Sequence, residues 1–149
     1  MKKLLIIILL AGLPLASQSQ TISKVTSFMQ LMQEMEEGLP ENWEMWDWQM
    51  INHPELNKLP VVMLEFAYRT PGLKEISTSV QLDLYDLTEK EKCTKFYEKH
   101  QEKGDQLVVF ETKGSVGFIS YSADAKRKKE QKKMVGFLKR FYGEHANDL

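Results

Sequence analysis

The chain has 149 residues, with 20 Lys and Arg against 21 Asp and Glu, which is room for one domain with its own core. Its single cysteine excludes an intramolecular disulfide, so hydrophobic packing has to hold the fold together. Because no internal repeat, low-complexity tract or linker interrupts the sequence, we expect a single domain.

The first 20 residues have the composition of a secretory signal peptide. Lys2 and Lys3 form a basic start, residues 4–15 are apolar, and small residues suited to cleavage follow. The apolar run is shorter than the roughly 20 residues of a membrane-spanning helix. We therefore predict a signal peptide at residues 1–20 and an exported domain at residues 21–149, periplasmic or secreted, without a transmembrane segment. An uncleaved anchor is the alternative.

The next two segments are expected to be a helix and a strand. Apolar residues at helical spacing predict an amphipathic helix over residues 23–37, which a glycine and a proline then end. We interpret residues 42–51 as a strand. However, Trp43, Trp46 and Met50 could equally mark one face of a helix.

Two runs, residues 61–69 and 76–86, have the clearest strand pattern. Apolar and polar side chains alternate along them, as expected when successive side chains point to opposite faces of a sheet. Between them, Pro71 and Gly72 suit the two central positions of a type II turn. We predict a β-hairpin at the centre of one sheet, with helices covering its apolar face.

The second half of the chain is expected to fold as helix, strand, strand, helix. Thr88 and Glu91 have capping-box spacing at the start of the first of these helices. Two short strands are predicted over residues 106–111 and 115–121, and a final helix over residues 123–142. The order α-β-β-β-α-β-β-α predicts a single small α+β domain with a mostly antiparallel four- or five-stranded sheet packed by helices.

Charge is distributed unevenly along the chain. Residues 126–140 carry eight Lys and Arg and one Glu, a net charge of +7, whereas residues 21–125 have a net charge of −8. On a helix most of these cations fall opposite an apolar stripe. The candidate residues for binding an anionic ligand are Lys126, Lys128, Lys129, Lys132 and Lys133.

The chemistry of this basic segment suggests its partners. A positive stripe attracts anionic polymers, lipid head groups or acidic proteins. Because export removes the protein from intracellular DNA and RNA, we expect no nucleic-acid partner. The expected partner is an anionic lipid head group or polysaccharide of the cell envelope, or another protein. A solvated face that balances the acidic body is the alternative.

Three tryptophans, Trp43, Trp46 and Trp48, lie beside Glu44 and Asp47 within six residues. Aromatic rings flanked by carboxylates can stack on sugars or anchor a protein interface. In a regular strand Trp46 and Trp48 would share one face and Trp43 would lie on the other. The alternative is packing in the core and at its edge.

The sequence contains no motif with catalytic or metal-ligand spacing. Its histidines, His53, His100 and His145, stand alone, and we predict no metal site and no cofactor. Cys93 and His100 are two helical turns apart, about 10 Å, which is too far for a base to activate a thiol. We expect a buried, unreactive Cys93. A thiol pKa lowered by the helix dipole is the alternative.

These observations favour a non-catalytic binding or interaction module of the cell envelope. Whether the protein has catalytic activity stays open, and the alternative is a small hydrolase that uses dispersed carboxylates and the loop histidine His53. A third interpretation is a structural envelope protein that self-associates through its uneven charge. The basic helix of one copy would then lie on the acidic body of another.

Overall fold

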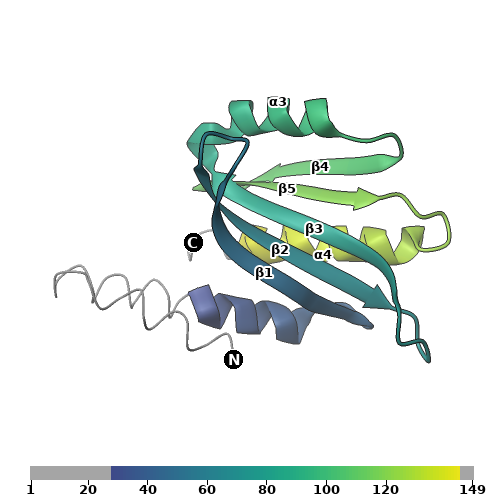
Figure 1. Ribbon diagram of the computed structural model, residues 1–149. Helices are drawn as coiled ribbons and strands as arrows, with labels where there is room; N and C mark the ends of the chain where they lie inside the picture. Colours follow the sequence, from purple (N-terminus) through teal and green to yellow (C-terminus); the bar gives the residue numbers. More distant parts are fainter. Residues whose placement is uncertain (1–27, 145–149) are drawn as a thin grey trace.

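The computed structural model describes residues 28–144 (Figure 1). The predicted signal peptide, the start of the first helix and His145 lie outside these residues. Within them the chain forms one α+β domain with a five-stranded antiparallel sheet and three α-helices, in the order α-β-β-β-α-β-β-α. The predicted fold class is therefore confirmed, and so is the interpretation of residues 43–51 as a strand.

The five strands lie in the spatial order β1-β2-β3-β5-β4, and every neighbouring pair is antiparallel. The strands are β1 (Trp43–His53), β2 (Leu59–Arg69), β3 (Ile76–Asp86), β4 (Asp105–Glu111) and β5 (Ser115–Ser122). The helices are a first helix over residues 28–38, a short 3-10 helix η2 (Leu87–Glu89), α3 (Lys90–His100) and α4 (Lys128–Glu144). In this part of the chain no helix combines the length and apolarity needed to cross a membrane.

The β2–β3 hairpin forms as its pattern predicts. Leu64 on β2 faces Leu82 on β3, and both are completely buried. In the turn, the Leu73 N–H donates to the Thr70 carbonyl at 3.0 Å, and Gly72 has φ of +83°. A type II turn needs a positive φ at this third position, which glycine adopts without strain. The hairpin places β3 in the middle of the sheet.

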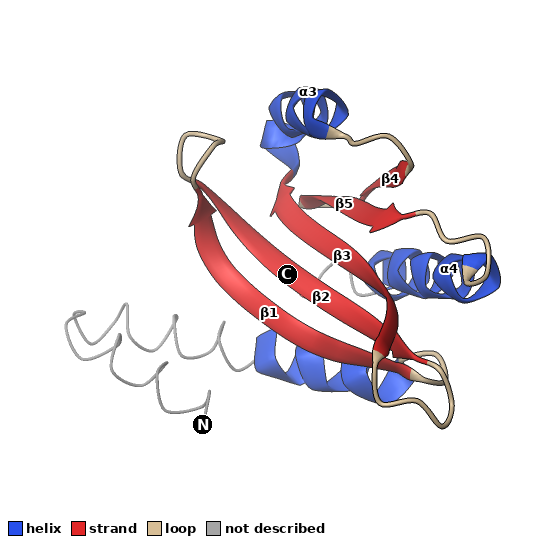
Figure 2. Cartoon of the chain, turned by 45° about the vertical axis from the view of Figure 1, so that its right-hand side comes forward, coloured by secondary structure: helices blue, strands red, loops and turns tan. Residues whose placement is uncertain are grey.

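One face of the sheet is covered by the first helix and by α4 (Figure 2). The apolar stripes of both helices meet the inward residues of β2 and β3, and each fully buried large side chain stabilises the fold by roughly 1.5–3 kcal/mol. The centre of this core consists of Met35, Leu64, Phe66, Leu82, Met134, Leu138 and Tyr142.

The opposite face is only partly covered. Helix α3 packs over one part of it and forms a second, smaller core with Leu56, Tyr85, Cys93, Val116 and Phe118. Over the rest of this face, on β1, β2 and the beginning of β3, no helix of the described chain is present (Figures 1 and 2). The sheet is thus covered by two helices on one side and half open on the other.

The start of α3 differs from the prediction. The carboxylate of Asp86 accepts hydrogen bonds from the Thr88 N–H at 2.9 Å and from the Thr88 hydroxyl at 2.6 Å. The cap therefore belongs to η2, and α3 begins only at Lys90 without a side-chain cap. The predicted capping box of Thr88 and Glu91 was wrong, because Asp86 accepts the Thr88 N–H that Glu91 would have accepted and also binds the Thr88 hydroxyl.

The start of α4 also lies later than predicted. The Asp124 carboxylate accepts the Lys126 N–H at 2.8 Å, and the Asp124 carbonyl accepts the Arg127 N–H at 3.0 Å. These bonds hold a turn at residues 124–127, and the helix begins at Lys128. Lys126 consequently lies in the turn that precedes α4.

Candidate functional site

The outer side of α4 carries six exposed cations, which we call the cationic face: Lys128, Lys129, Lys132, Lys133, Lys139 and Arg140. At 100° per residue they fall within an arc of about 140°. Met134 and Leu138 point in the opposite direction and are completely buried. At 1.5 Å per residue the face is about 18 Å long. It includes four of the five predicted lysines, and the fifth, Lys126, is exposed just before it.

The cationic face has no stabilising role that the structure reveals. Among residues 28–144, none of the ion pairs includes one of its six members. Lys128 and Lys129 occupy the first turn of α4, where the helix macrodipole is positive. A cation at that end costs roughly 0.3–1 kcal/mol instead of contributing to stability. Lys128 and Lys129 therefore oppose the local electrostatics of the helix that carries them.

Gln131 fixes the N-terminal part of α4 to the sheet. This side chain is only 2% exposed. Its amide nitrogen donates to the Thr78 hydroxyl and to the Ser122 carbonyl, both at 2.9 Å. Its amide oxygen accepts the Asp124 N–H at 3.3 Å. Because Gln131 bonds α4 to β3 and β5 in this way, the cations of α4 lie on a helix whose position on the sheet is fixed.

Arg127 adds a second attachment just before α4. Its guanidinium donates to the Thr70 hydroxyl at 2.7 Å and lies 5.7 Å from the ring centre of Tyr68. The apolar side of α4 is meanwhile part of the core. A folded molecule can therefore meet a lipid surface through the charges of α4 alone, since insertion of its apolar side would dismantle the core.

The three tryptophans do not form one aromatic platform. Trp43 is 7% exposed, and half-buried Trp48 packs on Phe28 of the first helix with ring centres 5.6 Å apart. Only Trp46 is largely exposed, at 51%. The Arg69 guanidinium lies 5.3 Å from its ring centre. A ligand that binds on the side of the sheet where Trp46 is exposed would therefore contact a single indole ring.

A β-bulge in β1 explains this distribution. Between Met45 and Asp47 the register with β2 shifts, so Trp46 is the extra residue of β1. The bulge reverses the alternation that follows, and Trp43 and Trp48 therefore share the helix-covered face. The expectation that Trp43 lies opposite Trp48 was wrong, because simple alternation contains no sign of an inserted residue.

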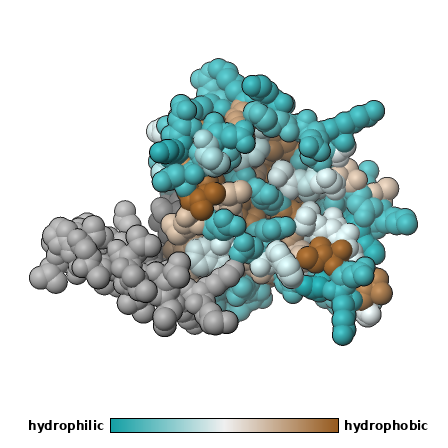
Figure 3. Space-filling model, in the orientation of Figure 1, coloured by the Kyte–Doolittle hydropathy of each residue, from teal (hydrophilic) through white to brown (hydrophobic). Residues whose placement is uncertain are grey.

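A polar row crosses the uncovered part of the sheet. Asp47 on β1 lies opposite Glu65 on β2, Glu65 opposite Gln81 on β3, and Gln81 opposite Ser120 on β5. Two carboxylates directly opposite one another repel, which is unfavourable for strand pairing. We call the surface formed by this row, together with Trp46 and Gln49, the open sheet face. Teal and white residues cover most of this side of the molecule (Figure 3).

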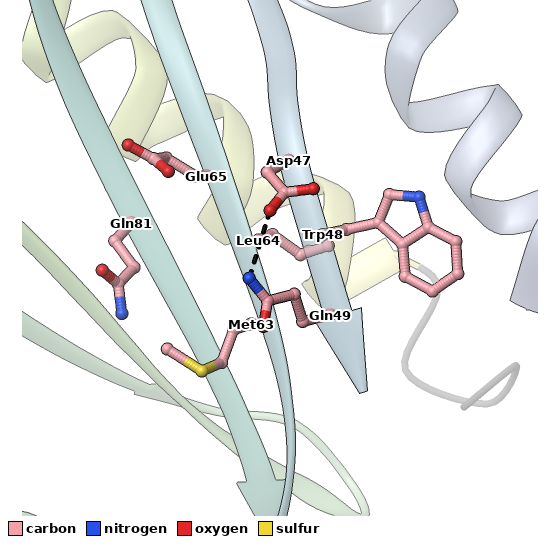
Figure 4. Close-up of a pocket in the computed structure, with 7 residues that line it drawn as sticks. All are labelled: Asp47, Trp48, Gln49, Met63, Leu64, Glu65 and Gln81. Atoms are coloured by element: carbon pink, nitrogen blue, oxygen red, sulfur yellow. Dashed lines mark hydrogen bonds between the residues drawn. The ribbon is translucent and has the colours of Figure 1, made fainter. Parts of the chain in front are cut away.

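The open sheet face contains a shallow hollow of about 50 Å³ (Figure 4). Gln49 donates to Asp47 at 3.1 Å along its edge, and Glu65 and Gln81 lie across from them. Trp48 also contributes to the wall, but its ring points away, toward a helix. A space of this size admits water or a small polar group, not a buried organic ligand.

Asp83 is a buried carboxylate at the border between the open sheet face and α3. It is 1% exposed and accepts two hydrogen bonds from the Gln81 amide, at 2.9 and 3.0 Å, and one from the Tyr97 hydroxyl. Burial raises the pKa of Asp83, although the bonds from Tyr97 and Gln81 and the proximity of His53 oppose that effect. Tyr85 and Tyr97 are joined by a hydroxyl contact of 2.9 Å.

The prediction from sequence missed this network. Asp83 occupies a polar position of an alternating strand, which suggested exposure to solvent. Helix α3 covers it instead and brings Tyr97 over it. Burial, followed by the charge of Asp83, raises the pKa of Tyr97. A tyrosine on the apolar stripe of a helix was the available signal, because a buried hydroxyl needs a partner.

Cys93 is completely buried under α3, as expected. Burial raises the pKa of its thiol to about 11, and the charge of Glu89 acts in the same direction. The alternative of a pKa lowered by the helix dipole is therefore wrong. His100 is exposed and hydrogen-bonded to the Phe96 carbonyl at 2.8 Å, so it does not serve as a base for Cys93.

His53 is used locally. Its Nδ1 accepts the Glu55 N–H at 3.3 Å, and its ring packs edge-on against Phe96 with ring centres 5.1 Å apart. It does not line the hollow of Figure 4. Across residues 28–144, no group of three His, Cys, Asp or Glu side chains is placed to hold a metal ion.

Comparison of the chain with models of protein families, with curated proteins and with solved structures gives no match in any of the three. The functional argument therefore depends on the geometry of the chain itself.

Proposed function

We propose that the protein is a non-catalytic binding module of the cell envelope that holds an anionic component on the cationic face of α4. The observation that carries this proposal is the placement of the cations. They are exposed on a fixed helix, unpaired with the carboxylates of residues 28–144, and partly located where they oppose the helix macrodipole. Selection for stability alone would favour acidic residues at positions 128 and 129 as well as at Glu130, the acidic residue that the first turn of α4 already contains.

The chemistry of the ligand follows from that of the face. Lysine ammonium groups act as point charges and bind phosphates and carboxylates without fixed geometry. A phospholipid head group and an acidic polysaccharide both present such groups in a closely spaced array. Each Lys or Arg near an anionic membrane surface contributes about 1 kcal/mol. Six of them suffice for attachment without any insertion.

The location is part of the proposal. The signal peptide predicted at residues 1–20 would place residues 21–149 outside the cytoplasm, where anionic lipids and acidic polysaccharides are the abundant polyanions. Nucleic acid is not expected as a partner there.

Binding can be tested by cosedimentation of the protein, residues 21–149, with vesicles. Neutral phosphatidylcholine vesicles are compared with vesicles that also contain phosphatidylglycerol, and an acidic polysaccharide is tested in parallel. Each is measured at about 0.01 M and about 1 M salt, where the Debye length is about 30 Å and about 3 Å. We expect binding to the anionic probes at low salt that disappears at high salt.

Two variants of equal net charge show whether α4 is responsible for binding to the anionic probes. In the first, Lys128, Lys129, Lys132 and Lys133 are changed to Glu. In the control, four exposed lysines elsewhere are changed to Glu: Lys58, Lys74, Lys99 and Lys103. Loss of binding in the first variant alone supports the proposal. Equal loss in both would mean that net charge and not the cationic face is responsible, and retained binding in the first would overturn the proposal.

A further inference from the structure

Strand β1 forms one edge of the five-stranded sheet (Figure 1). After the bulge at Trp46, its pairing with β2 is regular as far as His53. The four consecutive residues 49–52 are all exposed, and they include the large apolar side chains of Met50 and Ile51. Because successive side chains point to opposite faces, this half of β1 is exposed on both faces of the sheet. An edge strand of this kind is a template for pairing with another strand.

The register of β1 with β2 shows which backbone groups of β1 point outward. Asn52 lies opposite Pro60, which has no N–H to donate. The carbonyl of the next residue, His53, points inward and accepts the Lys58 N–H at 3.1 Å. Bonded and non-bonded pairs alternate along an antiparallel ladder, so every second residue of β1 directs its N–H and C=O away from β2. After the bulge these residues are Trp48, Met50 and Asn52.

We propose that the occupant of this edge is β1 of a second copy of the chain, paired antiparallel about Met50. Residue 50 is the middle of the regular stretch that follows the bulge. A two-fold axis at this position sets Met50 opposite Met50 of the second copy, and Trp48 opposite its Asn52. Every pair then joins residues whose N–H and C=O groups point outward. Three pairs with two bonds each give about six hydrogen bonds across the contact.

The side chains of this segment also suit pairing with themselves. Residues 48–52 carry no charge, so no like charges meet across the axis. Exposed Met50 would contact its own counterpart, and Ile51 would lie opposite Gln49.

The other edge strand, β4, is unsuited to the same contact. It begins at Asp105 and ends at Glu111. Antiparallel pairing of β4 with itself along its whole length would set these two carboxylates opposite one another, where they repel. Charged side chains are a common protection of a sheet edge, and the second half of β1 lacks this protection.

The contact is symmetric and closed. Its two-fold axis is perpendicular to the sheet, so two five-stranded sheets join edge to edge into one, and the pairing ends at a dimer. Such an axis does not exchange the two faces of the sheet. The α4 helices of both copies therefore stay on one side, bonded to β3 and β5 and away from the paired edges. The inference goes beyond the proposed function and does not depend on it.

Sedimentation of the protein, residues 21–149, over a concentration series tests the contact. We expect a monomer–dimer equilibrium at about 0.15 M salt that persists at about 1 M salt, because backbone hydrogen bonds and apolar contacts are not screened by ions. Met50→Lys and Met50→Glu should each shift the protein to the monomer mass. Either change sets two like charges directly opposite one another at the axis.

Mixing the two variants tests the register. In a mixed dimer the new lysine lies opposite the new glutamate, so dimers should return when Met50→Lys and Met50→Glu are combined. The matched controls are Leu73→Lys and Leu73→Glu. Leu73 is 60% exposed in the β2–β3 turn, compared with 61% for Met50, and lies outside the contact. Both control variants should dimerise like the wild type.

Each outcome either supports or overturns the inference. A wild-type protein that is monomeric at its highest soluble concentration overturns it. So does a Met50→Lys variant that still dimerises, or a mixture that stays monomeric, because the contact then lies elsewhere or has another register. Dimers that do not bind anionic vesicles support the inference and contradict the proposed function, whereas vesicle binding by a monomeric wild type does the reverse. Circular dichroism on each variant confirms that the fold is retained.

Discussion

The hydroxyl of Tyr97, on α3, donates a hydrogen bond to the carboxylate of Asp83, in the middle of β3. This bond joins α3, which packs on the half-open side, to the central strand of the sheet. It also provides a buried carboxylate with a donor that water would otherwise supply, because Asp83 is almost completely enclosed.

Replacing Tyr97 with Phe should therefore destabilise the protein by about 1.5–3 kcal/mol, the range for a hydrogen bond to a charged group. The comparison variant is Tyr85→Phe, which loses only the contact between the two hydroxyls. It should cost about 0.5–1.5 kcal/mol. Chemical denaturation of both variants measures the difference. Equal losses would mean that the bond to Asp83 has no special weight.

The raised pKa of Asp83 should make stability depend on pH. The folded protein binds the proton of the Asp83 carboxyl group more tightly than the unfolded chain does. The stabilisation that results is complete below the ordinary pKa of 3.8 and decreases as the pH rises through the folded-state pKa. Asp83→Asn abolishes this titration. The free energy of unfolding of the variant minus that of the wild type should increase from pH 4 toward neutrality. If the difference between the two free energies of unfolding did not change with pH, burial would not raise the pKa of Asp83 in the folded protein.

Reversing the first two charges of α4 should increase stability. With Lys128→Glu and Lys129→Glu the first turn would complement the macrodipole, and we expect a gain of roughly 0.3–1 kcal/mol for each. The same variant should bind anionic vesicles less well. Thermal unfolding and cosedimentation on one preparation measure both effects. A loss of stability would show that these lysines support the fold, which would weaken the functional explanation of the cationic face.

Cys93 should react slowly with thiol reagents in the native protein. The increase of its pKa from 9.0 to about 11 lowers the thiolate fraction at pH 8 roughly 100-fold. Burial adds a steric barrier. Alkylation by iodoacetamide, followed by mass spectrometry, should be at least this much slower than in denaturant. Similar rates in both conditions would mean that α3 opens readily from the sheet.

Gly117 should not tolerate a side chain. A Cβ atom at this position would lie 2.3 Å from two ring atoms of Phe110, directly across the β4–β5 pair. Gly117→Ala should cost about 1–3 kcal/mol through overpacking. Adding Phe110→Leu removes the ring, so the double variant should be more stable than the sum of the two single effects. Additive losses would contradict a direct clash.

Much of the fold follows from local patterns. Residues 61–69 and 76–86 pair as predicted, because alternation and turn chemistry are determined by neighbouring residues. The bulge at Trp46 could not be predicted, since an extra residue is recognised only against the partner strand. The helix starts were misplaced where Asp86 and Asp124 bond to the backbone ahead of the helices.

The candidate site was only partly accessible from the sequence. Helical periodicity correctly predicted that the lysines of α4 are exposed, because the opposite stripe is apolar. The separation of Trp46 from the other two tryptophans follows from the bulge. The open sheet face joins residues of β1, β2, β3 and β5, and only the strand order brings them together. Nothing local indicates which half of a sheet remains uncovered.

The arrangement of α4 and the half-open sheet on opposite sides gives the molecule a defined orientation. A copy that rests on a charged surface through α4 would turn β1, β2 and β3 toward the surrounding medium. Trp46 and the hollow beside it would then face outward at a fixed height above that surface. Such a molecule would act as a spacer with one side for attachment and one side for display.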